Sequence, residues 1–176
     1  IRSIKDIFEI LSAGADKVAI NTITIQKPQF IDLSARKFGS STIVVQIEAS
    51  KSLNGKYYAL TDNGRQETKK EAVGWAQEIE KRGGGEILLT SIDKEGTGEG
   101  LDLELLNLVS NAVKIPVIAH GGVGRYEDVK KALELTKIDG VAVSSLLHYS
   151  AMKKIKKNLS NSLEGNFEFI KNYKDF

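Results

Sequence analysis

The chain has 176 residues, of which 41% are hydrophobic, and its 25 basic and 23 acidic side chains leave a formal charge of only +2. This length suits one domain, residues 1–176, around a single core, and so small a charge argues against general binding to nucleic acid or membrane surfaces. Cysteine is absent, which excludes disulfides and thiolate metal sites, and no apolar run approaches the roughly 18 residues of a membrane span. We therefore expect a cytoplasmic protein without nucleic-acid or membrane partners.

Short runs rich in valine and isoleucine alternate along the chain with amphipathic stretches, as in proteins built from successive βα units. In chain order, the pattern predicts a helix at 4–13, a strand at 17–21, a helix at 27–38, a strand at 42–48, a helix at 70–81, a strand at 86–92, a helix at 103–112, a strand at 115–119, a helix at 126–135, a strand at 140–144 and a helix at 152–159. Residues 160–176 form a C-terminal tail without an assigned element. The alternation predicts an α/β fold with a parallel sheet.

A polar segment at 50–69 interrupts this alternation and predicts a hairpin insertion. Lys56 to Leu60 can form its first strand, and Asp62-Asn63-Gly64 has the composition of a tight turn. An insertion after a strand of a parallel sheet lies at the carboxyl ends of the strands, where ligand-binding loops gather. The hairpin is therefore either a lid over a site or an inert surface feature.

A weak internal repeat indicates how the strands are arranged. Residues 15–22 resemble residues 138–145, and the helices before them correspond as well. Two similar units so far apart indicate a pseudo-symmetric barrel whose halves hold similar sites. The predicted strands are too few for an eight-stranded barrel, so we expect an incomplete TIM-type (β/α)8 barrel, truncated at its N-terminus, with roughly three strands missing before Ile1.

Two glycines and two serines form the strongest candidate binding site. Gly121 and Gly122 follow a predicted buried strand, and Ser144 and Ser145 follow the next one. Glycines let the backbone approach an anion closely, and in TIM-type barrels the loops after the last two strands commonly hold a phosphate. The alternative is a pair of tight turns without a ligand.

The internal repeat extends this prediction to the start of the chain. Asn21 and Thr22 occupy the places that correspond to Ser144 and Ser145, which predicts a second phosphate site at the end of the strand 17–21. Two such sites on one barrel mouth predict a small ligand with a phosphate group at each end.

Polar residues at other strand ends are candidates for chemistry. Glu48 ends a strongly apolar strand, where it is either a general acid or base facing the mouth of the barrel or a solvated carboxylate that starts a loop. The loop after the next strand contains Thr90, Asp93 and Glu95, which can hold substrate hydroxyls or order the loop. In the same loop, the N–H of Gly96 can bind phosphate.

Other charged and aromatic residues have weaker signals. Lys17 and Glu86 lie at the amino ends of their strands, where they either stabilise the strands or form an interface. His120 and His148 lack the spacing of metal ligands, so no metal and no other cofactor is expected. Trp75 lies on an amphipathic helix, and we expect it to pack in the core or at its edge.

Taken together, these residues resemble one family, the cyclase subunit of imidazole glycerol phosphate synthase (HisF). The similarity extends from Ile1 to about Leu159 and is carried by residues 13–18, 20–22, 38–40, 85–93, 96–97 and 115–119 with Gly121 and Gly122. The resemblance implies a TIM barrel and an enzyme of histidine biosynthesis, a lyase that receives ammonia from a glutaminase subunit (HisH). The ammonia reacts with a ribulosyl aminoimidazole carboxamide nucleotide (PRFAR), and the products are imidazole glycerol phosphate and an aminoimidazole carboxamide ribotide (AICAR).

The resemblance also implies roles for individual residues. It assigns one substrate phosphate to Gly96, Gly121, Gly122, Ser144 and Ser145 and the other to Asn21 and Thr22. Lys17 and Glu86 match charged residues at the barrel base, where ammonia enters, and Asp16 matches a contact to the glutaminase.

The chain departs from the family pattern at several positions. Glu48 stands where the family has a catalytic aspartate, Glu95 replaces an aspartate, and His120 replaces a small residue. The hairpin ends in Thr68-Lys69 instead of Thr-Gly, and the second catalytic aspartate belongs to a strand outside this sequence. Two alternatives therefore remain: a HisF-like paralogue that passes ammonia to a sugar in surface-polysaccharide amidination, and a non-catalytic phosphosugar-binding scaffold that activates a glutaminase. We expect the chain by itself to be inactive.

Overall fold

The computed structural model describes residues 1–155, and the side chains of residues 1–151. The expected C-terminal tail 160–176 and the end of the helix expected at 152–159 lie outside the described residues. Helices and strands follow one another in the order α1 (Ile4–Ser12), β1 (Val18–Ile20), α2 (Thr22–Gln26), α3 (Gln29–Phe38), the 3-10 turn η1 (Ser40–Thr42), β2 (Ile43–Lys51), β3 (Tyr57–Thr61), β4 (Gln66–Glu71), α4 (Ala72–Lys81), β5 (Glu86–Ser91), α5 (Leu103–Ser110), β6 (Val117–His120), α6 (Tyr126–Leu135), β7 (Gly140–Ala142) and α7 (Ser145–Ile155).

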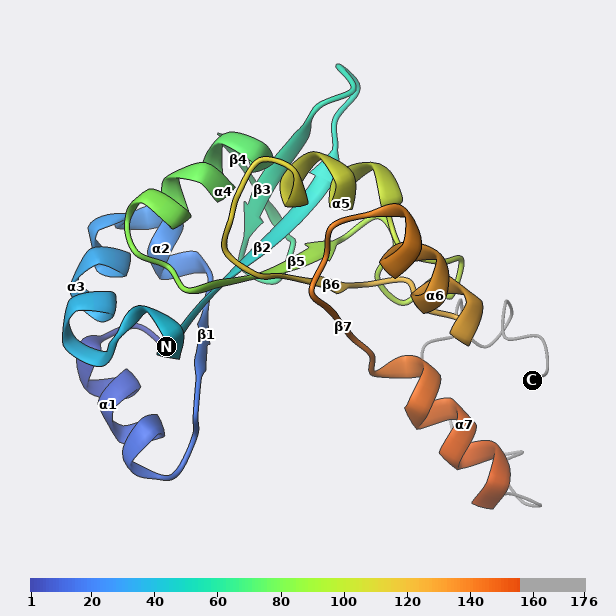
Figure 1. Cartoon of the computed structure of the whole chain (residues 1–176), viewed down its shortest axis with the longest axis horizontal. Coiled ribbons are helices and arrows are strands. Elements are labelled where there is room, and N and C mark those ends of the chain that lie inside the picture. Colours follow the sequence, from blue (N-terminus) through green and yellow to red (C-terminus); the bar gives the residue numbers. More distant parts are fainter. Residues whose placement is uncertain (156–176) are drawn as a thin grey trace.

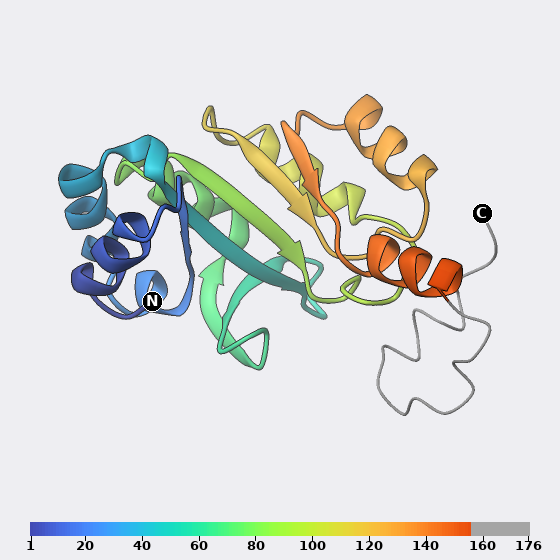
Figure 2. The same cartoon turned by 90° about the horizontal axis from the view of Figure 1, so that it is seen from below.

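Parallel strands form the centre of the sheet, in the order β1-β2-β5-β6-β7. The hairpin of β3 and β4 extends the sheet by antiparallel pairing on β2. Figure 1 shows α1, α3, α4, α5 and α6 in an arc outside the sheet, and Figure 2 looks onto the opposite, inner face. Among the described strands β1 and β7 do not pair, so the sheet is an open segment of a barrel. This arrangement confirms the expected α/β fold with an incomplete (β/α) barrel.

The hydrophobic core lies between the sheet and this layer of helices. Along β2, Ile43, Val45 and Ile47 are fully buried and alternate with side chains that face the inner side. Burial of each such isoleucine contributes about 1.5–3 kcal/mol to stability, and Trp75 of α4 belongs to the same core, as expected. Because successive side chains of a strand point to opposite faces, burial of Ile47 against the helices directs Glu48 to the inner face.

Three helices differ from the predictions made from sequence, and the largest difference is at α7, which begins at Ser145 and not at residue 152. α2 is not among the predicted helices because its β-branched residues disfavour that conformation. In the structure the Thr24 hydroxyl donates to the Asn21 carbonyl at 2.6 Å and stabilises the first turn. α4 begins at Ala72 and not at Lys70, because the end of the segment 66–71 pairs with β3.

The hairpin occupies the part of the β2 edge that β1 leaves free. β1 pairs with residues 43–45 of β2, and β3 pairs with residues 48–51. The hairpin turn, residues 62–65, has left-handed backbone at Asp62 (φ 54°), Asn63 (φ 58°) and Gly64 (φ 72°). The Asp62 N–H donates to the Thr22 hydroxyl at 3.2 Å, so this turn lies at the carboxyl end of β1.

Candidate functional site

A row of side chains crosses the inner face of the sheet at the carboxyl ends of the strands. Glu48 of β2 lies beside Thr90 of β5, Thr90 beside His120 of β6, and His120 beside Ala142 of β7. Thr90 is only 1% exposed, and its Oγ1 lies 3.2 Å from His120 Nδ1. We call Glu48, Thr90 and His120 the inner row. Strand register thus places three polar groups from three segments next to one another.

Glu48 is held by several donors although it is nearly buried. Its Oε2 accepts from Asn21 Nδ2 at 2.9 Å and from the Gly64 N–H at 2.8 Å, and its Oε1 accepts from Gln46 Nε2 at 3.2 Å. Burial raises the pKa of Glu48, and the nearby charge of Glu95 adds to the increase, although the Gly64 and Asn21 hydrogen bonds oppose it. Because a general acid or base works best when its pKa approaches the working pH, this environment favours proton transfer.

The hairpin turn contributes directly to the surroundings of Glu48. The Gly64 N–H donates to the Glu48 carboxylate, and Gly64 also packs closely against the loop after β5: a Cβ atom at Gly64 would lie 2.7 Å from Ile92 Cδ1. The positive φ of 72° at Gly64 also favours glycine. The hairpin, for which the sequence leaves two roles open, is therefore part of the surroundings of Glu48.

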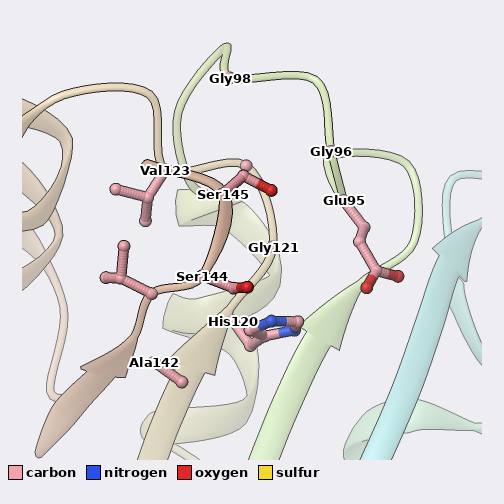
Figure 3. Close-up of a pocket in the computed structure, with 11 residues that line it drawn as sticks. Glu95, Gly96, Gly98, His120, Gly121, Val123, Ala142, Ser144 and Ser145 are labelled. Atoms are coloured by element: carbon pink, nitrogen blue, oxygen red, sulfur yellow. The ribbon is translucent and has the colours of Figure 1, made fainter. Parts of the chain in front are cut away.

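A cavity of about 220 Å³, which we call the loop pocket, opens beside the inner row. Its lining comes from the loops that follow β5, β6 and β7 and consists of Glu95, Gly96, Gly98, His120, Gly121, Gly122, Val123, Ala142, Val143, Ser144 and Ser145. Figure 3 shows the hydroxyl groups of Ser144 and Ser145 on one side of this pocket and Glu95 on the other. The structure therefore brings together the two loops that the sequence predicts to share a phosphate.

Glycine is required in this pocket by the close approach of two loops. Gly122 has a φ of 99°, its carbonyl accepts the Gly100 N–H at 2.8 Å, and a Cβ atom there would lie 2.3 Å from the Gly100 oxygen. Gly121, with a φ of 94°, would meet the Ser91 oxygen at 2.8 Å. Since α7 begins at Ser145, its first N–H groups also lie beside the pocket, and such groups attract anions.

A second cavity, of about 830 Å³, lies at the carboxyl end of β1. Asn21 and Thr22 line it together with the basic residues Arg2, Lys27 and Arg65. Asn21 Oδ1 is buried and has no hydrogen-bond partner among the described residues, which leaves an acceptor available to a ligand. We call this space the β1 cavity.

The remaining residues of the predicted substrate loop have separate positions. Glu95 and Gly96 line the loop pocket, and Thr90 belongs to the inner row. Asp93 is exposed and accepts the Lys51 N–H at 2.8 Å, so it ties the loop after β5 to the end of β2. This bond favours the role of Asp93 in ordering the loop, one of the two roles expected for it.

The opposite rim of the sheet contains an ion pair between strand starts. Lys17 Nζ lies 2.6 Å from Glu86 Oε2, and the Lys17 side chain is half exposed. Asp16 precedes Lys17 and is exposed. These residues lie at the amino ends of β1 and β5 and are therefore separated from the inner row by the length of the strands.

Sequence reasoning missed a buried cluster that supports the site. Asp102, the N-cap residue of α5, accepts from Tyr57 Oη at 3.0 Å, from Ser91 Oγ at 3.1 Å and from the Leu105 N–H at 3.1 Å. Burial and the neighbouring Asp102 charge raise the pKa of Tyr57, so the phenol stays protonated. An aspartate before an apolar helix is a capping signal, but its long-range partners leave no mark in the sequence.

Two searches of the described residues complete this picture. Residues 1–155 contain no group of three or more histidine, aspartate or glutamate side chains arranged to hold a metal ion. No helix in the same part of the chain is long and apolar enough to span a membrane.

Comparison with known proteins shows which proteins are similar to this chain. The family model described as "Histidine biosynthesis protein" matches residues 1–153. The chain is 48% identical over 149 residues to the imidazole glycerol phosphate synthase subunit HisF of Hydrogenobaculum sp. (strain Y04AAS1), a match that covers 85% of the chain and 59% of that protein. It is 53% identical over 128 residues to the HisF subunit of Legionella pneumophila, a match that covers 73% of the chain and 60% of that protein.

The chain thus spans about 60% of the length of these curated relatives. The family match covers nearly all the described residues, including the inner row, both cavities and the Lys17–Glu86 ion pair. These similarities confirm the family resemblance seen in the sequence, and the chain belongs to the histidine biosynthesis protein family.

Proposed function

We propose that this chain contributes acid–base chemistry and phosphate binding to the cyclase reaction of imidazole glycerol phosphate synthase, a lyase reaction of histidine biosynthesis. PRFAR and ammonia are the reactants, and imidazole glycerol phosphate and AICAR are the products. The proposal depends on one geometric feature, the position of a buried carboxyl group relative to two candidate anion-binding cavities. This group shares the inner row with a residue that lines one cavity, and it accepts a hydrogen bond from a residue that lines the other. Glu48 is that carboxyl group, His120 lines the loop pocket, and Asn21 lines the β1 cavity.

The two cavities suit the two phosphate groups of such a substrate in different ways. The loop pocket offers backbone N–H groups at Gly96, Gly121 and Gly122 and the hydroxyls of Ser144 and Ser145, which can surround a phosphate. The β1 cavity offers the polar side chains of Asn21 and Thr22 together with arginine and lysine side chains. A substrate held at both ends places its middle against Glu48.

Glu48 is the proposed proton carrier at the reacting centre. Addition of ammonia and closure of the imidazole ring both require protons to move between nitrogen and oxygen atoms, and a positioned carboxyl group typically speeds such steps by about 10²–10⁴-fold. The raised pKa of Glu48 and its fixed hydrogen bonds to Asn21 and Gly64 support this role.

The partner proposed for this chain is a glutaminase subunit of the HisH type that supplies ammonia. It would bind the rim with Asp16, Lys17 and Glu86, opposite the inner row. Both HisF relatives are named as subunits of a synthase, which supports assembly with a second protein. Ammonia would then enter at the amino ends of the strands and react at their carboxyl ends.

Turnover of PRFAR with ammonium chloride tests the proposal. The full-length gene product that contains this chain is compared with its Glu48→Asp and Glu48→Ala variants, and imidazole glycerol phosphate is separated by chromatography. We expect Glu48→Ala to lower kcat by about 10²–10⁴-fold and to raise KM by a smaller factor, because Asn21 of the β1 cavity loses its bond to Glu48. Glu48→Asp should retain most of the activity.

The PRFAR assay, together with assays of glutaminase activity and of sugar amidination, separates the competing functions. No detectable product from either the natural protein or Glu48→Asp would reject the cyclase. Stimulation of a glutaminase without turnover of PRFAR would instead support a non-catalytic scaffold. Transfer of ammonia to a sugar, without turnover of PRFAR, would support the paralogue that acts on a surface polysaccharide.

A further inference from the structure

The loop pocket has an unusual charge balance for a site that is to hold phosphate. Among the described residues that line it there is no lysine or arginine, and the Glu95 carboxylate contributes a negative charge. A phosphate monoester at neutral pH carries nearly two negative charges. Within the described lining, His120 is the one side chain that can acquire a positive charge.

The His120 ring is fixed in a way that suits both of its charge states. Nδ1 lies 3.2 Å from the hydroxyl of Thr90, which is 1% exposed. A hydroxyl group can donate to Nδ1 of the neutral ring or accept from the Nδ1–H of the charged ring. In both arrangements Nε2 carries a proton, and Figure 3 shows the ring between Ser144 and Glu95 at the floor of the pocket. Thr90 thus orients His120 while Nε2 remains a donor.

Carboxylate groups lie on the elements that surround His120. Glu95 lines the same pocket from the loop after β5, and Glu48 lies in the same inner row on β2. The nearby Lys94 is engaged elsewhere, with Nζ 3.3 Å from Glu99 Oε2. On the α6 side, the Asp128 carboxylate accepts two backbone N–H groups of the loop after β6. Glu95 is therefore the carboxylate in the described lining of the pocket, and His120 is the side chain there that can offset its charge.

We propose that His120 is a phosphate-binding residue of the loop pocket that acts as an imidazolium, so that the pocket binds anions more tightly when His120 is protonated. This inference rests on the proposed phosphate site and deepens it. The charged ring donates Nε2–H to a ligand oxygen and Nδ1–H to Thr90, and charge-assisted hydrogen bonds are roughly twice as strong as neutral ones. Histidine ordinarily changes charge between about pH 5 and 8, so the affinity falls as the pH rises through that range.

Sulfate binding to the whole chain tests this inference, because sulfate remains a dianion from about pH 5 to 9 and its own charge does not change. Two-dimensional ¹H–¹⁵N NMR titrations at constant ionic strength follow the amide signals of Gly121 and Gly122 near pH 5.5 and near pH 8.5. We expect the Kd of sulfate to be about tenfold lower at the acidic pH, because one added charge-assisted hydrogen bond changes the affinity by about this factor. Reciprocally, saturating sulfate should move the titration midpoint of the His120 ring signals upward by about one pH unit.

The His120→Gln variant is the matched control, since its amide keeps a donor near the pocket but cannot become charged. Its Kd is expected to be the same at both pH values and close to the Kd of the natural protein at the alkaline pH. A pH dependence that persists in His120→Gln assigns the effect to Glu95 or Glu48 and overturns the inference. If that variant does not fold, the His120 midpoint in the natural protein decides by itself, and an unchanged midpoint overturns the inference.

The outcomes also separate this inference from the proposed function. Sulfate that shifts the Gly121 and Gly122 signals with the same Kd at both pH values would overturn the role of His120 and leave the phosphate site standing. Sulfate that shifts neither signal at either pH would overturn both.

Discussion

Asn21 and Glu48 lie 27 residues apart in the sequence, and the Asn21 side-chain amide donates to Glu48 Oε2 at 2.9 Å. The Gly64 N–H donates to the same oxygen at 2.8 Å. Both bonds favour the ionised carboxylate, but burial outweighs them and the pKa of Glu48 is raised. The carboxyl group is therefore fixed in direction while it holds its proton more tightly than an ordinary glutamate does.

Replacement of Glu48 by glutamine is expected to stabilise the protein near pH 8 and to have little effect on stability near pH 4. The folded-state pKa of Glu48 lies above its unfolded value. Its contribution to stability is therefore fully present below the ordinary glutamate pKa of about 4.3 and is lost as the pH rises through the folded-state value. Glutamine stays neutral and retains an oxygen for Asn21 and Gly64. Urea unfolding at both pH values measures the difference, and equal destabilisation at both would contradict the prediction.

The hairpin turn should be more sensitive to substitution at Gly64 than at Gly55. Both glycines have left-handed backbone, with φ of 72° and 82°, so alanine strains either position by about 1–2 kcal/mol. At Gly64 the new methyl group also meets Ile92 at 2.7 Å, whereas at Gly55 nothing lies within 4 Å. We expect Gly64→Ala to cost about 1–3 kcal/mol more than Gly55→Ala.

Urea unfolding of the two glycine variants checks that difference, and activity provides a second readout. Because the Gly64 N–H donates to Glu48, Gly64→Ala should also lower turnover, whereas Gly55→Ala should not. Equal losses of stability and activity in the two variants would show that the hairpin turn does not support the Glu48 site.

Asp102 should matter more for stability than any one of its donors. Asp102→Ala removes the acceptor of Tyr57, of Ser91 and of the Leu105 N–H at once. Loss of the helix cap costs about 0.5–2 kcal/mol, and a buried hydroxyl left without a partner costs about 1–3 kcal/mol more. Tyr57→Phe removes one donor and leaves two, so it should cost only about 1 kcal/mol. Denaturant unfolding of both variants checks the order, and a larger loss for Tyr57→Phe would contradict it.

The Lys17–Glu86 ion pair should affect binding of the proposed glutaminase partner more than it affects stability. The Lys17 side chain is half exposed, and exposed pairs contribute about 0–1 kcal/mol. Lys17→Met should therefore change the free energy of unfolding by less than about 1 kcal/mol. The same variant should weaken binding to the glutaminase, measured by titration calorimetry.

Lys130→Met is the matched control for this experiment, because Lys130 forms an exposed ion pair with Glu134 within α6 and not between two strands. It should leave glutaminase affinity unchanged. Unaltered affinity in Lys17→Met, or an equal loss in both variants, would argue against the rim with Lys17 and Glu86 as the docking surface.

The sequence by itself determined the alternation of strands and helices and the places of the glycine loops. These features depend on short-range signals: the short apolar runs of β2 and β5, and the backbone freedom of glycines such as Gly121 and Gly122. Helix α2 was beyond such reasoning, because its β-branched residues favour strands locally and the bond from Thr24 to Asn21 overrides that preference.

Only the tertiary structure decided which of these residues act together. Strand register places Glu48, Thr90 and His120 in one row, and the switch from β1 to β3 along one edge of β2 brings Gly64 to the Glu48 carboxylate. Register and edge pairing depend on contacts between segments that are distant in the chain. A local pattern specifies which face a side chain takes, whereas its neighbours on that face are set by how the whole sheet is assembled.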